Sequence, residues 1–333
     1  MTGSLDSPLF HVTQIVDTLE SAFDSHRRLF YRPVSYGGYW DVCERSAIAT
    51  FVGDVIVEGM VPHRRKDGSY SFAGHDLAAF LGAPGGGHLH SLAWYARDIN
   101  DLAARLRAWG VRFTDTEGHP IEAEVPTHGP IPVVPGSSTK YPPGWNSAVL
   151  YSYFEDCAGM IELCEPSSYH PGMAERRSGK LPQPAADPDT PVQGWQATDP
   201  LGVKRVSHQT IVVPDARHAC RFFTEVFDGR LISEGESQVM GAKTITVSVG
   251  KGIGTVLELA EPVASGPARA DLEAFGHGIL HRCTFLVEDL GPVRDHLARE
   301  EFPVEAQSSS LVVVDPAGAA GSRFGFTTED LSA

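Results

Sequence analysis

Two segments of one design open at His11 and at His208, and this recurrence constrains the fold more than any other feature of the chain. Each segment begins with a short run rich in β-branched residues, is broken by Thr, Pro or Asp, and continues with the pattern of an amphipathic helix. Each then ends in a strand-like run that carries a glutamate, Glu58 in DVIVEGMVP and Glu258 in GTVLELAEPV. A histidine and a glutamate that recur together indicate an internal repeat and favour a metal site.

Two further blocks share a plan of their own. LHSLAWYARDINDLAARLRAWGV begins at Leu89, and LHRCTFLVEDLGPVRDHLAREEF begins at Leu280. Both read Leu-His, then an apolar strand, then Asp98 or Asp289 as a helix N-cap, then apolar residues at helical spacing. In all four blocks the sequence after the helix is extended and is divided by Gly or Asp turns. The sequence therefore predicts a βαβββ unit repeated four times, which is an α+β fold.

Stretches rich in Pro, Gly and charge, without periodicity, mark the predicted connectors. One runs from His63 to Gly87, another from Ser167 to Pro200, and a shorter break precedes Ile279. The second is long enough to separate two domains. The predicted organisation is a first domain at 1–168 (modules 8–66 and 87–168), a linker at 169–204, and a second domain at 205–333 (modules 205–264 and 277–330).

Composition excludes several classes of partner. The chain has 333 residues, 42% of them hydrophobic, and a net charge of -15 that repels nucleic acid. No apolar run approaches the roughly 18 residues of a membrane span, and no basic and apolar leader opens the sequence. Five scattered cysteines without C-x-x-C spacing predict reduced thiols. We therefore expect a cytoplasmic protein with neither a nucleic acid nor a membrane as partner. The sequence is compatible with a homodimer but does not fix the oligomeric state.

Five motifs carry a family resemblance. They are H-V-x-Q-I-V at His11, H-Q-T-I-V-V-P-D at His208, FFTEVFDGRL, DCAGMIEL at 156–163 and DPAGAAGSRF at 315–324. With these motifs the chain resembles the vicinal oxygen chelate superfamily, which includes glyoxalase I, methylmalonyl-CoA epimerase, bleomycin and fosfomycin resistance proteins and extradiol dioxygenases. The resemblance covers nearly the whole chain outside the connectors. It implies that the four modules pair into two half-open barrels, with a divalent metal in a barrel's concavity.

In this family the metal ligands come from the first and last strands of the modules. Carried over by position, the first domain offers His11, Glu58, His90 and Glu162. The resemblance therefore implies one divalent metal ion in the first domain, with zinc, manganese, iron, nickel and cobalt left open. Two carboxylates in this set also imply that Glu58 or Glu162 can act in catalysis.

The second domain offers an incomplete set. His208, Glu258 and His281 occupy ligand positions, but Gly325 stands where the family has a glutamate. The resemblance therefore implies a degenerate second site and an active first one.

The chemistry explains why this combination of residues is useful. Neutral imidazoles and one or two carboxylates hold a borderline divalent ion and leave positions open for two adjacent substrate oxygens. Such an ion is a Lewis acid toward a carbonyl or enolate, and a nearby carboxylate can move the acidified proton. Glu162 lies in the apolar run MIEL, where an unpaired carboxylate is costly to bury.

Register decides whether His90 reaches the metal. In most family members the second-module histidine lies seven residues before the Asp that starts the helix, and that position here is Ser91. Because strand side chains alternate, a shift of one residue points His90 away. His90 lies eight residues before Asp98, the same eight-residue offset separates His281 from Asp289, and a β-bulge absorbs one residue. The sequence leaves the choice between His90 and Ser91 open.

Three functions compete. The preferred reading is a non-redox enzyme, an isomerase, epimerase, lyase or hydrolase that works through a metal-stabilised enolate or oxyanion. The alternative is an Fe(II)-dependent extradiol-type dioxygenase, because YFEDCAGMIE, from Tyr153 to Glu162, approaches the dioxygenase signature and implies Tyr153 as a catalytic residue. Cys157 replaces the signature's Pro, and the family's catalytic histidine before Tyr153 is missing. A non-catalytic binder of the drug-resistance branch is the third reading, although such binders lack the metal set.

The substrate is expected to be a small oxygenated molecule, hydrophobic or aromatic, because aromatic residues cluster around the inferred site. The segment from Thr127 to Ser147 is long and Pro-rich, which is typical of a lid, a pocket wall or a contact between domains. Core packing is the competing explanation for these aromatic residues, above all for Trp94. The residues are Trp40, Trp94, Tyr95, Trp145, Tyr151 and Tyr153.

Overall fold

The computed structural model describes residues 5, 9, 11–30, 36–40, 45–96, 98–128, 147–164, 201–250 and 254–331. Most of the predicted linker, Trp145 and most of the Thr127–Ser147 segment lie outside these residues.

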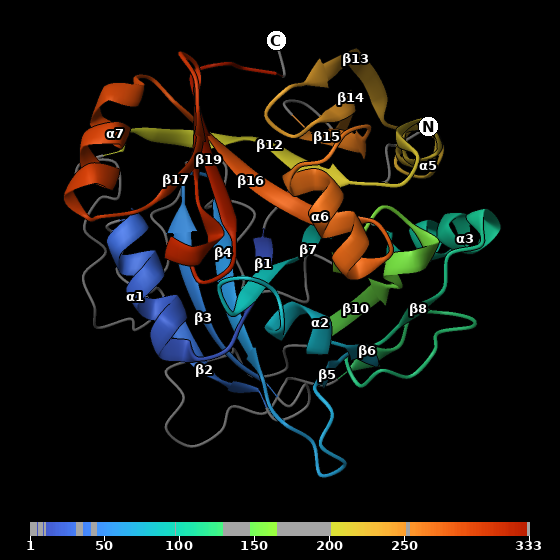
Figure 1. Ribbon diagram of the computed structural model, residues 1–333. Helices are drawn as coiled ribbons and strands as arrows, with labels where there is room; N and C mark the ends of the chain where they lie inside the picture. The colour runs from blue at the N-terminus through green and yellow to red at the C-terminus, as the bar shows by residue number, and fades with distance from the viewer. Residues whose placement is uncertain are drawn as a thin grey trace.

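The described part of the first domain forms one mixed sheet of nine strands (Figure 1). Its order is β2-β3-β4-β1-β7-β11-β10-β8, with β9 paired to β10. This order places the first and last strands of both modules side by side at the centre. The first module contains β1 (His11–Val16), α1 (Leu19–Phe30), β2 (Tyr36–Trp40), β3 (Arg45–Val52) and β4 (Val55–Pro62). The second contains β7 (Gly87–Tyr95), α3 (Ile99–Trp109), β8 (Phe113–Thr114), β9 (Thr127–His128), β10 (Ser147–Ser152), η1 (Phe154–Asp156) and β11 (Met160–Cys164).

The described part of the second domain forms a separate sheet of eight strands in the matching order β13-β14-β15-β12-β16-β19-β18-β17. The predicted α+β fold of four βαβββ modules is therefore confirmed. Its third module contains β12 (Val203–Val212), α5 (Ala216–Val226), β13 (Arg230–Ser237), β14 (Ala242–Val249) and β15 (Thr255–Pro262). Its fourth contains β16 (Ile279–Val287), α7 (Leu290–Arg299), β17 (Val304–Gln307), β18 (Leu311–Val314), η4 (Pro316–Gly318) and β19 (Arg323–Thr327).

The helices begin where the sequence predicts. The Asp98 carboxylate accepts a hydrogen bond from the backbone N–H of Asp101 at 2.9 Å, and the Asp289 carboxylate accepts one from Gly291 at 2.8 Å. Such caps satisfy backbone donors that have no partner within the helix. None of the described helices is both long and apolar enough to cross a membrane.

Two stretches predicted to be plain connectors contain secondary structure. Between His63 and Gly87 lie β5 (Ser71–Phe72), β6 (His75–Asp76) and α2 (Ala78–Leu81), and before Ile279 lies α6 (Pro267–Phe275). The β5, β6 and α2 segments carry too few residues to show a periodic pattern, and the nine residues of α6 lie in a stretch whose Pro, Gly and Ala are typical of a connector. Similarly, β12 begins at Val203, inside the predicted linker, because Val203 pairs with Val287 of β16.

The two domains are joined by buried hydrogen bonds. Trp94 Nε1 donates to Thr255 Oγ1 at 2.9 Å, so Trp94 packs at the domain interface, as the core-packing explanation expects. Gln14 Nε2 donates to the carbonyl oxygens of Ala319 at 2.9 Å and Ala320 at 2.8 Å. Both amide hydrogens of Gln14 are thereby used across the interface.

Buried His26 completes this connection. Gln14 Oε1 lies 3.0 Å from His26 Nε2, and Thr50 Oγ1 lies 3.1 Å from His26 Nδ1. Because Gln14 Oε1 can only accept, Nε2 of His26 carries the proton and Nδ1 accepts from the Thr50 hydroxyl. Both ring nitrogens of neutral His26 therefore have a hydrogen-bond partner.

Acid is expected to weaken the fold through His26. Burial lowers the pKa of His26 to about 4, whereas the ring titrates near 6.5 when exposed. Between these values the unfolded chain binds a proton that the folded chain does not. The free energy of unfolding therefore falls as the pH drops from 6.5 to 4, by up to about 3 kcal/mol for this residue. The stabilisation is complete above pH 6.5.

His26→Gln tests this expectation, because an amide keeps one donor and one acceptor without titrating. Urea unfolding at neutral pH and near the folded-state pKa should show a smaller acid loss in the variant than in the parent. His119→Gln, whose ring is 70% exposed, is the matched control. Equal acid losses in the His26→Gln variant and the parent would contradict the assignment.

Candidate functional site

The central strands bring three of the four predicted first-domain ligands, His11, Glu58 and Glu162, onto one face of the sheet. Thr13 of β1 pairs with Glu58 of β4 on one side and with Ser91 of β7 on the other. Two residues along, Ala93 lies between His11 and Glu162 of β11. Residues in register across neighbouring strands point to the same side, as do residues two apart along one strand. We call this the inner face of the first domain, defined by His11, Thr13, Glu58, Ser91 and Glu162.

Glu162 receives most of the polar contacts on this face. His11 Nε2 donates to Glu162 Oε2 at 3.0 Å. Tyr151 OH and Cys164 Sγ approach Glu162 Oε1 at 3.5 Å and 3.3 Å. The second carboxylate, Glu58, accepts from Thr13 Oγ1 at 3.1 Å, and His11, Glu58 and Glu162 are all at most 5% exposed. Two carboxylates and one imidazole are thus buried on adjoining strands.

The chemistry of this donor set fits a divalent metal ion. Ligand atoms about 2.1 Å from an ion and about 90° apart lie about 3 Å from each other. The 3.0 Å separation of His11 Nε2 and Glu162 Oε2 therefore suits two neighbouring ligands as well as a hydrogen bond. Among the described residues, no three His, Cys, Asp or Glu side chains are already grouped closely enough to hold an ion. Glu58 is hydrogen-bonded to Thr13 and would have to turn to complete the set.

A β-bulge lies at the position where the sequence left the register open. Thr13 pairs with Ser91, but the next residue, Gln14, pairs with Leu89, so His90 is the extra residue. The His90 ring packs against Phe80 and Phe154, with ring centroids 5.0 Å and 5.3 Å away. Ser91 therefore takes the register position beside Thr13.

Tyr151, rather than Tyr153, contacts Glu162. On β10, Tyr151 pairs with Glu162 and points toward the inner face. The Tyr153 ring lies 4.6 Å from the ring of His75 and beneath the Arg112 guanidinium at 4.5 Å. Tyr153 was expected from the dioxygenase-like signature to be catalytic, but β10 ends at Ser152, so Tyr153 lies beyond the strand and Tyr151 is the tyrosine in register with Glu162.

The insert between β4 and β7 covers the inner face. The Phe72 ring of β5 meets the Tyr151 ring edge to face at 4.9 Å, and Phe80 of α2 meets Phe275 of α6 at 4.8 Å. Figure 1 shows α2 and α6 side by side at the centre of the molecule. Tyr95 is two strand positions beyond Ala93 and packs in the same apolar cluster as Phe72 and Tyr151. The cover over the inner face is therefore aromatic.

The second sheet repeats this face position by position. Thr210 of β12 pairs with Glu258 and with Arg282, His208 pairs with Thr284, and Thr284 pairs with Gly325. A bulge follows here too, because Ile211 pairs with Leu280 and leaves His281 as the extra residue. We call this the inner face of the second domain, defined by the counterparts of the first set, His208, Thr210, Glu258, Arg282 and Gly325.

Arg282 forms the centre of this second face. Its Nη2 donates to Glu258 Oε2 at 3.2 Å and to Thr210 Oγ1 at 3.3 Å, and its Nε donates to Thr284 Oγ1 at 3.1 Å. Burial raises the pKa of Glu258, but His208, Arg282 and Thr210 outweigh it, and the pKa lies below its ordinary value. Burial lowers the pKa of His208 to about 4. Glu258 is therefore charged and His208 neutral near pH 7.

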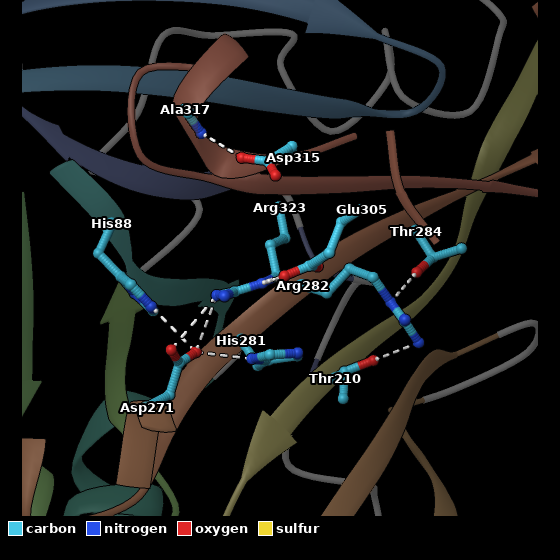
Figure 2. Close-up of polar contacts among 10 residues, drawn as sticks. All are labelled: His88, Thr210, Asp271, His281, Arg282, Thr284, Glu305, Asp315, Ala317 and Arg323. Atoms are coloured by element: carbon cyan, nitrogen blue, oxygen red, sulfur yellow. Dashed lines mark hydrogen bonds and ion pairs between the residues drawn. The ribbon is translucent and has the colours of Figure 1, made fainter. Parts of the chain in front are cut away.

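His281 belongs to a separate polar cluster at the domain interface (Figure 2). Asp271 of α6 accepts from His281 Nδ1 at 2.6 Å, from His88 Nε2 at 3.2 Å and from Arg323 Nη1 at 3.1 Å. Arg323 also binds Glu305 at 3.0 Å. Burial raises the pKa of Asp271, but the hydrogen bonds and charges of His281 and His88 outweigh it and hold the pKa below its ordinary value. The cluster connects β7 of one domain to α6, β16 and β19 of the other.

Two of these residues escaped the sequence reasoning for different reasons. Arg282 had a detectable signal, because it lies seven residues before Asp289, as Ser91 lies before Asp98. Asp271 had none, because it lies in a stretch that reads as a connector.

Comparisons with known proteins agree with this geometry. Residues 205–309 match the family model described as Glyoxalase/Bleomycin resistance protein/Dioxygenase superfamily. The second domain belongs to this superfamily. The resemblance drawn from the motifs is therefore confirmed. A comparison with curated proteins finds no match.

Two solved structures share the fold of the entire chain. A mutant of 4-hydroxymandelate synthase from Streptomyces coelicolor aligns with a TM-score of 0.64 and 14% identity, over 98% of this chain and 92% of that chain. The 2,3-dioxygenase LapB from Pseudomonas sp. KL28 aligns with a TM-score of 0.55 and 15% identity, over 98% of this chain and 93% of that chain. The chain thus shares the two-domain fold of these two structures.

Proposed function

We propose that this chain is a metal-dependent enzyme whose active site is the inner face of the first domain. One observation carries the proposal: the two inner faces differ in charge at matching positions. The first has Glu58 and Glu162 with an uncharged Ser91, whereas the second has Glu258 with Arg282 and Gly325. A divalent ion would bring positive charge to a face with two buried carboxylates, at the place where the second face carries an arginine.

Each residue of the first face has a distinct role in this proposal. His11 and Glu162 would hold the ion, and Glu58 would join them or remain beside them. When bound, the ion supplies Lewis acidity toward adjacent substrate oxygens. Tyr151 and Cys164 hold the far oxygen of Glu162 and so fix the direction of its carboxylate. Glu58, held by Thr13, is the group placed to accept a proton from a bound substrate.

The cover of the site supports a substrate that is aromatic or hydrophobic and carries neighbouring oxygens. Phe72 and Tyr151 contact each other beside Glu162, and Tyr95 lies in the same apolar cluster. Binding sites of this kind combine apolar walls with a few polar groups.

The comparisons support the dioxygenase reading better than the non-redox reading that the sequence favoured. LapB, a 2,3-dioxygenase, shares the two-domain plan over nearly the full length. We therefore place a dioxygenase reaction first, in which both atoms of O2 enter an aromatic diol. The first face departs from the usual Fe(II) set, because it pairs one imidazole with two carboxylates in place of two imidazoles with one.

Proton transfer is the second candidate, and Glu58 favours it. The Fe(II) set of two histidines and one carboxylate has no use for a second carboxylate. An isomerase, epimerase or lyase, in contrast, needs a base beside the ion. Glu58 occupies that place, in register with Thr13 on the neighbouring strand.

Metal analysis of the purified protein tests the proposal. We expect about one ion per chain, retained in His208→Ala and lost in His11→Ala. The two histidines are matched controls, because each lies two residues before the threonine that pairs with a glutamate. Iron together with oxygen uptake on catechols would support the dioxygenase. Zinc, manganese, nickel or cobalt without oxygen uptake would support proton transfer. If His11→Ala leaves the metal content unchanged, the proposed site is wrong.

A further inference from the structure

The second domain has an arginine at the centre of the face where its fold family implies a metal. Arg282 occupies the register position that Ser91 has in the first domain. The neighbouring positions match one to one: His208 corresponds to His11, Thr210 to Thr13, and Glu258 to Glu58. The Arg282 guanidinium donates to two threonines and to Glu258 (Figure 2 shows the threonines). The residues present on this face therefore do not fit a metal ion.

We infer that the Arg282 guanidinium is a built-in cation that replaces the metal of the second domain. This inference rests on the second face alone and does not depend on the proposed function of the first. Arginine suits the role because it stays charged when buried and presents five donors in a fixed plane. A second domain that carries its own cation stays folded and neutral without any metal supply.

Gly325 is the steric counterpart of Arg282. A Cβ atom built at Gly325 would lie 3.0 Å from Thr284 Oγ1 and 3.3 Å from Arg282 Cδ. The stem of Arg282 and its partner Thr284 thus fill the space that a side chain at position 325 would need. Gly325 and Arg282 therefore belong to the same replacement. Arg282 on β16 supplies the positive charge, and Gly325 on β19 stands where the family has its second carboxylate.

Charge balance agrees with this replacement. Glu258 and Arg282 form a buried pair with side chains 14% and 4% exposed, and neutral His208 lies 3.8 Å from the same carboxylate. Removing one member of such a pair leaves the other charge uncompensated. A divalent ion entering beside the guanidinium would meet a like charge at close range, which disfavours binding.

The first test uses the unmodified chain. Titration with Co²⁺, followed by visible absorption and by metal analysis, should give no more than one ion per chain, and Glu258→Gln should not lower that number. A second ion that is lost in Glu258→Gln or His208→Ala would overturn the inference. If the first domain binds no metal, the proposed function fails, but the inference stands as long as the second domain also remains free of metal.

The second test restores the metal ligand. Arg282→His places an imidazole between His208 and Glu258 and completes a set of two histidines and one carboxylate. We expect this variant to bind one more Co²⁺ per chain than the parent. Arg282→Lys, which keeps the charge, and Arg282→His combined with Glu258→Gln, which lacks the carboxylate, should not gain an ion. A folded Arg282→His protein with no additional Co²⁺ would count against the inference.

A third measurement remains informative even if Arg282→His is poorly folded. Arg282→Met and Glu258→Gln should each lower the unfolding temperature, by about 10 °C for the arginine, because each strands a buried partner. The double variant should lose less than the sum of the two single losses. Fully additive losses would show that Arg282 does not neutralise Glu258.

Discussion

Gly321→Ala is expected to lower the unfolding temperature by about 10 °C, corresponding to about 4 kcal/mol. Gly321 has a φ of +85°, and a Cβ atom there would lie 2.0 Å from the carbonyl oxygen of Gly87. Gly87 begins β7 of the first domain, and Gly321 leads into β19 of the second. The methyl group cannot be accommodated unless the two backbones separate, which would also strain the nearby bonds from Gln14 to Ala319 and Ala320.

Gly276→Ala is the matched control. Gly276 also has a left-handed backbone, with a φ of +74°, but a Cβ atom there meets nothing within 4 Å. Its substitution should cost only the backbone strain, about 1 kcal/mol. Thermal unfolding of the two variants under identical conditions separates two costs. Both variants carry the strain of a left-handed backbone, but only Gly321→Ala carries the steric clash with Gly87. Equal losses would mean that the close approach of Gly87 and Gly321 does not hold the domains together.

The repeat made the fold predictable from the sequence. Each of the four blocks has the same strand, helix and strand pattern, so each predicts the same βαβββ module. Aspartates such as Asp98 and Asp289 mark where the helices begin. Short elements between the blocks could not be predicted. α2 has four residues, and α6 begins at a proline within a stretch rich in Gly and Ala. Their positions depend on contacts between distant residues, such as Phe80 with Phe275.

The candidate site was predictable in its residues but not in its register. Strand alternation alone could not decide between His90 and Ser91, because a bulge moves one residue out of the pattern. The structure places the bulge at His90 and repeats it at His281. The two bulge histidines then have different surroundings, with His90 against phenylalanine rings and His281 against Asp271. That difference arises from α2 and α6, two of the elements that lie in the predicted connectors.

The two carboxylates of the first face should separate into a ligand and a base. Glu162 faces His11 at 3.0 Å and is held by Tyr151 and Cys164, whereas Glu58 is held by Thr13 on the neighbouring strand. Loss of a residue that only hydrogen-bonds to a metal ligand weakens metal binding by up to roughly 100-fold. Because Glu162 is proposed to be a ligand itself, we expect Glu162→Gln to weaken Co²⁺ binding by more than this. Glu58→Gln should keep its metal within roughly 10-fold and lower kcat by about 100-fold to 10,000-fold.

The amide variants are nearly isosteric with glutamate, so a difference between them reports chemistry more than packing. Calorimetric titration with Co²⁺ measures the ligand role, and turnover of catechols by the metal-loaded protein measures the base role. Glu155→Gln, at a side chain that is 57% exposed beside Arg112, controls for the loss of one negative charge. If Glu58→Gln loses its metal as completely as Glu162→Gln, both carboxylates bind the ion and the base must come from another residue. A Glu58→Gln protein with full turnover would instead remove Glu58 from the chemistry and leave the metal with a single carboxylate, Glu162.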